Sequence, residues 1–199
     1  MAADKKLLIT GFDPFGGEHV NPSWEAVKRL PEEIGRYRLE KMQIPTVFER
    51  AAQAVLARAE IVGADAIICV GQAGGRSAVT PEVIGINLRE ARICDNAGQK
   101  PENTPVIEDG PAAYFTTLPV REMVSAIEKA GLPAALSYSA GTFVCNDVLY
   151  TLLHRYQGTD VRVGFIHVPF LPEQAPENVP SLAEAQIIAA LEAAIEVLE

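Results

Sequence analysis

The chain has 199 residues, of which 48% are apolar and 22% charged, a composition typical of a globular protein with a hydrophobic core. Its 26 acidic and 17 basic residues give a net charge of −9. Because an acidic chain repels phosphate backbones and anionic lipids, this balance argues against nucleic acid and membrane surfaces as partners.

The apolar pattern predicts strands that alternate with helices along the chain. Strands are expected at 7–10, 38–44, 66–70, 134–137 and 161–168, and helices at 22–30, 46–61, 120–130, 146–155 and 181–198. This alternation predicts an α/β fold: one domain over residues 1–199, with a twisted, mostly parallel central sheet flanked by helices on both sides. Residues 82–110 break the rhythm and are expected to form inserted strands and turns.

Three glycine-rich loops, at residues 10–17, 71–76 and 137–146, follow predicted strands. Ligands of parallel α/β sheets gather at the carboxyl ends of the strands, so the loops predict one site built from distant segments. No loop matches the dinucleotide fingerprint or the Walker pattern, and we do not expect a nucleotide. Phe12 and Phe15 suit a flat apolar ligand better than a phosphate.

The three cysteines are odd in number and far apart, unlike the cysteines of a secreted disulfide framework. The apolar run at residues 7–10 is too short for the core of a signal peptide, so we expect a reduced, cytoplasmic protein. Cys69 lies in a buried strand by composition, and Cys94 lies in a polar turn. Cys145 follows a turn of small residues and precedes an apolar helix, which places its sulfur where a helix N-terminus favours a thiolate. A half-buried structural cysteine stays open as the alternative.

A cysteine nucleophile usually needs a histidine, and the chain has three. His154 lies nine positions after Cys145 in the same predicted helix, which turns it to the opposite side about 13 Å along the axis. His19 lies in the first loop, where no local pattern fixes it. His167 ends an apolar strand and is well placed to meet Cys145. A histidine that is simply hydrogen-bonded at a strand end is the alternative.

Glu82 is the candidate for a carboxylate that fixes the imidazole tautomer. In a strand, Glu82 shares one face with Ile84 and Ile86, and a carboxylate on that apolar face needs a partner such as a histidine. An exposed glutamate at a strand end is the alternative. The histidines are isolated, and no His-Glu-x-x-His or paired-cysteine spacing occurs, so neither a metal nor a cofactor is expected.

Together these segments resemble pyroglutamyl peptidase I, also called pyrrolidone carboxyl peptidase, a family of cysteine peptidases. The resemblance covers residues 8 to about 172, and residues 137–146 carry its most specific motif. Further matching segments are residues 10–17 with Asn21-Pro22-Ser23, residues 71–76, residues 91–98 and His167-Val168-Pro169.

The resemblance implies a cysteine exopeptidase that hydrolyses the bond after an N-terminal pyroglutamyl residue through a thioester. It implies a catalytic triad of Cys145, His167 and Glu82. It also implies substrate-binding residues: Phe12, Phe15 and Phe143 as walls of a lactam pocket, Asn21 and Gln72 as groups that orient the lactam, and Arg92 beside the oxyanion. The implied partners are peptides with N-terminal pyroglutamate, and the implied assembly is a homo-oligomer, a dimer or tetramer.

The sequence departs from the family where Val83 replaces a basic residue and Gly85 replaces an alanine. Strand alternation turns Val83 away from Glu82, so the triad contact is expected to hold. Two other functions stay open: a serine hydrolase that uses Ser139, which lies in half of a nucleophile-elbow pattern, and a binding protein without turnover. Asp13 is the only acid expected near the pocket.

Overall fold

The structure, a computed structural model, describes residues 4–198. Its main sheet has six strands in the order β2 (Glu33–Ile34), β3 (Tyr37–Ile44), β1 (Lys5–Phe12), β4 (Ala66–Gln72), β8 (Arg162–Val168) and β5 (Thr80–Pro81). The four central strands run parallel, and the short strands β2 and β5 pair antiparallel at the edges. The predicted mostly parallel sheet is therefore confirmed.

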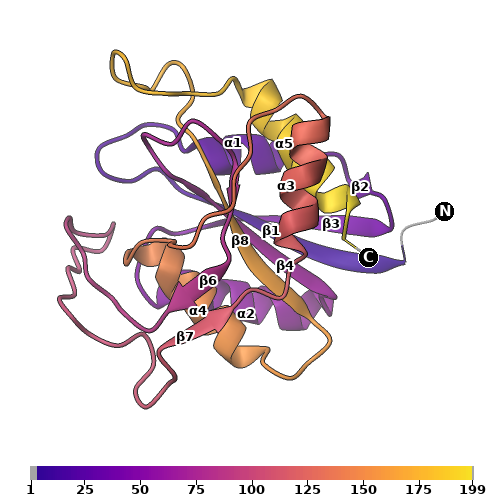
Figure 1. Cartoon of the computed structure of the whole chain (residues 1–199). Helices are drawn as coiled ribbons and strands as arrows, with labels where there is room; N and C mark the ends of the chain where they lie inside the picture. Colours follow the sequence, from indigo (N-terminus) through magenta and orange to yellow (C-terminus); the bar gives the residue numbers. More distant parts are fainter. Residues whose placement is uncertain (1–3, 199) are drawn as a thin grey trace.

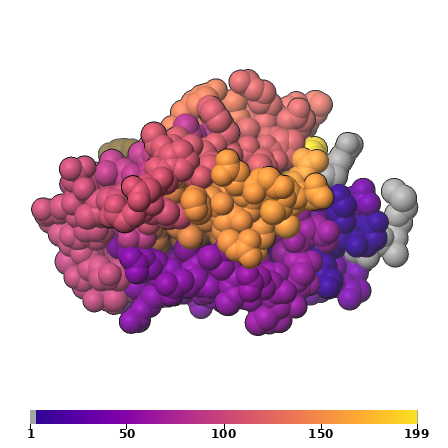
Figure 2. Space-filling model, turned by 90° about the horizontal axis from the view of Figure 1, so that it is seen from below, coloured from indigo at the N-terminus to yellow at the C-terminus, as the bar shows by residue number. Residues whose placement is uncertain are grey.

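Helices cover both faces of this sheet, as predicted (Figure 1). One face carries α1 (Pro22–Arg29), α3 (Val120–Lys129) and α5 (Glu184–Glu196), and the other carries α2 (Arg50–Val62) and α4 (Val144–Arg155). Each face has its own apolar cluster. Leu7 and Ile9 of β1 point to the first and Leu8 to the second, because successive side chains of a strand point to opposite faces. Figure 2 views the molecule from the side of α2 and α4, with the purple surface around α2 beside the orange surface around α4.

The helix predicted at 46–61 begins later, at Arg50. Distant carboxylates hold the preceding turn through backbone N–H groups that donate at 2.6 to 3.0 Å: Thr46 to Asp13, Phe48 to Asp95 and Glu49 to Asp147. The other four predicted helices are confirmed, with ends shifted by a few residues. The shift in α4 places Cys145 inside its first turn.

The strand predicted at 134–137 is wrong. This segment makes only single parallel bridges, between Val79 and Ala134 and between Glu82 and Ser137. Pro81 lies between the two bridges and has no N–H, so it interrupts the ladder. The segment therefore runs beside Glu82 and leads into the glycine loop before α4.

The predicted insertion lies between β5 and α3 and contains a small antiparallel sheet of β6 (Ile84–Ile86) and β7 (Ala113–Phe115). A long loop joins these two strands. The buried Asp95 carboxylate holds the loop through four hydrogen bonds of 2.8 to 3.1 Å, from the backbone N–H groups of Phe48, Ala97 and Gln99 and from the Gln99 amide.

We predict that Asp95→Ala lowers the free energy of unfolding by about 2–4 kcal/mol, because each buried donor that loses its acceptor costs roughly 1–3 kcal/mol. Glu102→Ala removes an exposed carboxylate from the same loop and serves as the matched control, with no measurable change expected. Urea unfolding of both variants measures the difference. Equal stability of the two variants would contradict the role of Asp95.

Candidate functional site

A cavity of about 720 Å³ lies at the carboxyl ends of β4 and β8, the side of the sheet on which these parallel strands feed their loops (Figure 1). Six of the nine predicted site residues line it: Phe15, Gln72, Arg92, Phe143, Cys145 and His167. The predicted convergence of distant loops is therefore observed.

The Cys145 side chain packs against β4 at Gly71. A Cβ atom on Gly71 would lie 3.0 Å from the Cys145 sulfur and 2.7 Å from the Phe165 ring. In the sheet, Gly71 pairs with His167 on β8. Because Gly71 has no side chain, the Cys145 sulfur can pack against β4 at the position that pairs with His167.

Asn146, which the sequence analysis did not assign, anchors the start of α4. Its buried side chain accepts a hydrogen bond from the Ile86 N–H (2.9 Å) and donates to the carbonyls of Ile86 (2.8 Å) and Leu88 (3.0 Å). These bonds fix the helix start to β6 and thereby fix the position of the adjacent Cys145.

Glu82 and His167 form a buried pair beside the cavity. The His167 Nδ1 and Glu82 Oε1 atoms are 2.7 Å apart, and the Glu82 side chain has no exposed surface. The alternative of an exposed strand-end glutamate is therefore wrong. Because Nδ1 is engaged by the carboxylate, Nε2 is the ring nitrogen that can serve the cavity.

Burial and neighbouring charges shift the pKa values of Cys145, His167 and Glu82. Burial raises the pKa of the Cys145 thiol to about 12, and the negative charge of Glu82 adds to this. Burial also lowers the pKa of His167, although its hydrogen bond to Glu82 opposes the effect. Burial alone would raise the pKa of Glu82, but its partners His167, Ser137 and Arg76 bring it below its ordinary value. Both shifts favour the neutral thiol and imidazole, and thus act against the thiolate expected from the helix N-terminus.

Arg76 is a further charged residue at the cavity, and the sequence analysis gave it no role. Its guanidinium donates to Glu82 Oε1 (2.8 Å), to the Thr80 hydroxyl (2.5 Å) and to the Ser139 carbonyl (3.0 Å). The sequence signal was its place as the last residue of the second glycine loop, a segment that matches the family.

The aromatic side of the cavity contains Phe15 and Phe143, whose ring centroids are 6.1 Å apart. Phe48 packs edge-on against Phe143 at 5.2 Å and supports it from the core. Phe170, which no sequence motif indicated, also lines the cavity. Its ring lies so close to Gly74 that a Cβ there would be 2.2 Å away.

Two predicted binding residues lie outside the cavity lining. Phe12 is buried in the core, with its ring centroid 6.1 Å from that of Phe165. Asn21 caps α1 by accepting from the Ser23 N–H, and its amide donates to the Asp13 carbonyl. Both residues therefore hold the first glycine loop in place.

The departures from the family pattern leave the buried pair intact. Val83 packs against the apolar cluster under α1, α3 and α5, while Glu82 points to His167. Gly85 lets β6 approach α4 closely, since a Cβ there would lie 3.1 Å from the Leu149 side chain. Arg76 supplies the cation next to Glu82.

The other candidate residues differ in their distance from the cavity. His154 is exposed, and its Nδ1 is 2.9 Å from the Tyr114 hydroxyl. Ser139 lines the cavity, and its hydroxyl accepts from the Gly141 N–H within the loop before α4. Cys69 is buried in β4 and Cys94 is exposed.

The expectation that Asp13 is the only nearby acid is wrong, because Glu90 lies at the cavity. Glu90 accepts from the Asn103 N–H at 2.7 Å, and Asp13 accepts from the Thr46 N–H at 2.6 Å. Both carboxylates are therefore engaged in holding loops.

Among residues 4–198, no group of three or more His, Cys, Asp and Glu side chains has an arrangement that could hold a metal ion. In the same part of the chain, no helix has the length and apolar character needed to cross a membrane.

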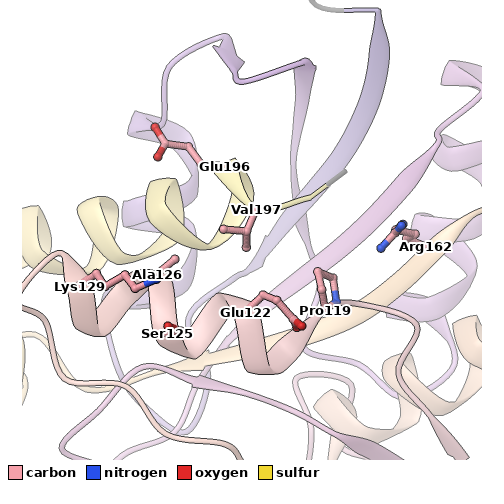
Figure 3. Close-up of a pocket in the computed structure, with 8 residues that line it drawn as sticks. All are labelled: Pro119, Glu122, Ser125, Ala126, Lys129, Arg162, Glu196 and Val197. Carbon is pink, nitrogen blue, oxygen red and sulfur yellow. The ribbon is translucent and has the colours of Figure 1, made fainter.

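Figure 3 shows a second cavity, of about 640 Å³, between α3 and α5. It lies beside Arg162, at the end of β8 opposite to His167. Its charged lining consists of Glu122, Lys129, Arg162 and Glu196, and none of its eight lining residues is a cysteine or histidine. The Cys145 cavity is therefore the candidate active site.

Comparison with known proteins identifies the family. The sequence model described as pyroglutamyl peptidase matches residues 5–199. The pyrrolidone-carboxylate peptidase of Enterococcus faecalis is 50% identical over 196 residues, which cover 98% of this chain and 92% of the relative. That of Bacillus thuringiensis is 46% identical over 198 residues, covering 97% and 92%.

Solved structures agree with the sequence relatives. The crystal structure of pyroglutamyl peptidase I from Bacillus amyloliquefaciens superposes with a TM-score of 0.93 at 49% identity, covering 97% of this chain and 96% of that one. Pyrrolidone carboxyl peptidase from Thermococcus litoralis gives a TM-score of 0.92 at 37% identity, covering 97% and 92%. On sequence and fold together, the chain belongs to the pyroglutamyl peptidase family.

Proposed function

We propose that this chain is a cysteine exopeptidase that removes an N-terminal pyroglutamyl residue from peptides. The observation that carries the proposal is the buried Glu82–His167 hydrogen bond at the same cavity as Cys145, in a chain of this family. A nucleophile, a base and a carboxylate that orients the base are the groups needed for acyl transfer through a covalent intermediate.

The pKa directions determine how the nucleophile forms. Because burial favours the neutral forms of Cys145 and His167, we assign His167 to take the thiol proton as the sulfur attacks the carbonyl after pyroglutamate. The protonated ring then donates to the leaving amine, which leaves a thioester on Cys145. Neutral His167 next activates water, which releases pyroglutamate and restores the thiol. Glu82 stabilises the imidazolium in both halves of the cycle.

The start of α4 offers a place for the oxyanion. The first N–H groups of a helix have no partner within the helix, and the N–H of Cys145 is one of them. Donors aimed at a developing negative charge stabilise the transition state. We assign this role to the Cys145 N–H, with Arg92 at the cavity beside it.

The cavity suits a neutral ring. Phe15 and Phe143 supply apolar walls, and Gln72 supplies an amide for the lactam. Phe12 and Asn21 act indirectly, by holding the first loop. A protonated N-terminal amine placed against these rings would lose hydration that the rings do not replace, which costs free energy.

We further propose a single catalytic domain over residues 1–199, a homo-oligomeric assembly of two or four copies, and a reducing, cytoplasmic location. The exposed apolar side chains of Phe115 (73%) and Tyr138 (62%) support association, because large exposed apolar groups mark interaction surfaces. The free state of Cys69, Cys94 and Cys145 supports the reducing location.

We predict that pyroglutamyl amides are cleaved with a kcat/KM several orders of magnitude above that of prolyl amides. The two rings are similar in size, but proline carries a charge and lacks the ring carbonyl, and each effect costs a few kcal/mol. Release of a fluorescent amine measures both rates. Comparable values would contradict the pocket proposed for the lactam.

We predict that Cys145→Ser abolishes turnover, whereas Cys94→Ser and Cys69→Ala keep most of it at equal folded concentration. The reason is that only Cys145 shares the cavity with His167. Iodoacetamide labelling with mass spectrometry gives an independent check in the wild-type protein. Full activity after stoichiometric labelling of Cys145 would rule it out as the nucleophile.

We predict that the acidic limb of the kcat/KM profile has its midpoint below pH 6.5. This limb reports the free enzyme, in which the base must be neutral, and the pKa of His167 lies below its ordinary value. Activity is thus retained as the pH falls through 6.5 and is lost when His167 takes up a proton. A midpoint above 6.5 would contradict the assignment of His167 as the base.

A further inference from the structure

Arg76 contacts three parts of the site at once. One terminal nitrogen, Nη1, donates to Glu82 Oε1 (2.8 Å) and to the Thr80 hydroxyl (2.5 Å), and the other, Nη2, donates to the Ser139 carbonyl (3.0 Å). Its side chain is 30% exposed. The planar fork of an arginine can hold several acceptors in fixed directions, which the point charge of a lysine cannot.

Glu82 depends on this contact. Its Oε1 accepts from both Arg76 and His167, and its buried Oε2 has no partner within normal hydrogen-bond distance among residues 4–198. The nearby Ser137 hydroxyl also lowers the pKa of Glu82 but carries no charge, so Arg76 is the permanent cation at this carboxylate. A buried carboxylate that loses its cationic partner either remains as an uncompensated charge or takes up a proton. In both cases the bond that orients His167 is altered.

We propose that Arg76 is a positioning residue that keeps Glu82 ionised and aimed at His167 and ties the loop before Cys145 to the same carboxylate. This inference rests on the proposed function. Arg76 acts through Glu82 and takes no part in bond making. Its contact with the Ser139 carbonyl holds the loop at residues 137–142, whose last residues lead into α4.

The charges around the Glu82–His167 pair set the pH at which activity is lost. Substitution of a residue with a purely structural role would leave this pH unchanged. His167 is faced by Glu82 and Arg76, and Cys145 is faced by Glu82, Arg76 and the neutral Cys69. Removal of the Arg76 cation raises the affinity of the coupled Glu82–His167 pair for protons, whichever residue binds the proton. The acidic limb of kcat/KM therefore moves to higher pH.

The test compares Arg76→Met with Arg89→Met. Arg89 also pairs with a buried carboxylate, Asp147, at 2.6 Å, but it does not line the cavity. For Arg76→Met we expect kcat to fall about 100-fold with little change in KM, less than the roughly ten-thousand-fold that neutralising a triad carboxylate can cost. For Arg89→Met we expect lower stability and an unchanged acidic limb.

A double variant separates action through Glu82 from an independent effect. If Arg76 acts through Glu82, then Arg76→Met causes little further loss of kcat in a Glu82→Gln background, because coupled residues are not additive. Losses that multiply, or an unchanged acidic limb in Arg76→Met, would overturn the proposal. Should Arg76→Met fail to fold, Arg76→Gln keeps a donor without the charge and has the same two expected results.

NMR titration of the histidine rings distinguishes failure of this inference from failure of the proposed function. The chain has three histidines, so substitution of His19 and His154 leaves the signal of His167. Its apparent pKa should rise in Arg76→Met, whether or not the protein cleaves pyroglutamyl amides. An unchanged pKa in a folded variant would refute the role of Arg76, even if the wild-type enzyme is active.

Discussion

The site depends on one constraint: the Glu82 carboxylate has no exposed surface and must be compensated inside the protein. Two donors meet its Oε1, from His167 on β8 and from Arg76 at the end of the glycine loop after β4. Neighbouring strands thus converge on one oxygen atom. An uncompensated buried charge is strongly destabilising. The contacts of Arg76 and His167 with Glu82 therefore stabilise the fold, and the same contacts orient His167.

The site also requires helices and strands to approach each other closely. Glycine occupies the positions where a side chain would collide with the neighbouring element. The Cys145 sulfur fits against β4 because Gly71 has no Cβ, and α4 packs on β6 because Gly85 has none. At Gly11, a Cβ would lie 2.5 Å from the backbone of Trp24 in α1. The glycines of the first two loops therefore set distances between layers, which in turn place the loops around the cavity.

The sequence allowed the central strands, the helices and the position of Cys145 at a helix start to be predicted, because these follow from local periodicity and turn chemistry. It did not allow the start of α2 to be predicted, because side chains from two distant loops and from α4 accept the N–H groups before Arg50. The role of Arg76 was missed for a similar reason, since its partners Glu82 and Ser139 are brought to it only by the tertiary fold. Phe12, which the resemblance implies as a pocket wall, is buried with its ring against that of Phe165.

The net charge of −9 is distributed over the whole chain, and several acids of the surrounding loops bind donors within the protein. Asp13 and Asp95 accept backbone N–H groups, Asp147 pairs with Arg89, and Glu90 holds the N–H of Asn103. These carboxylates order the loops around the site. The proposed preference for a neutral N-terminal lactam rests instead on the apolar walls of Phe15 and Phe143, which would take hydration from an ammonium group without replacing it.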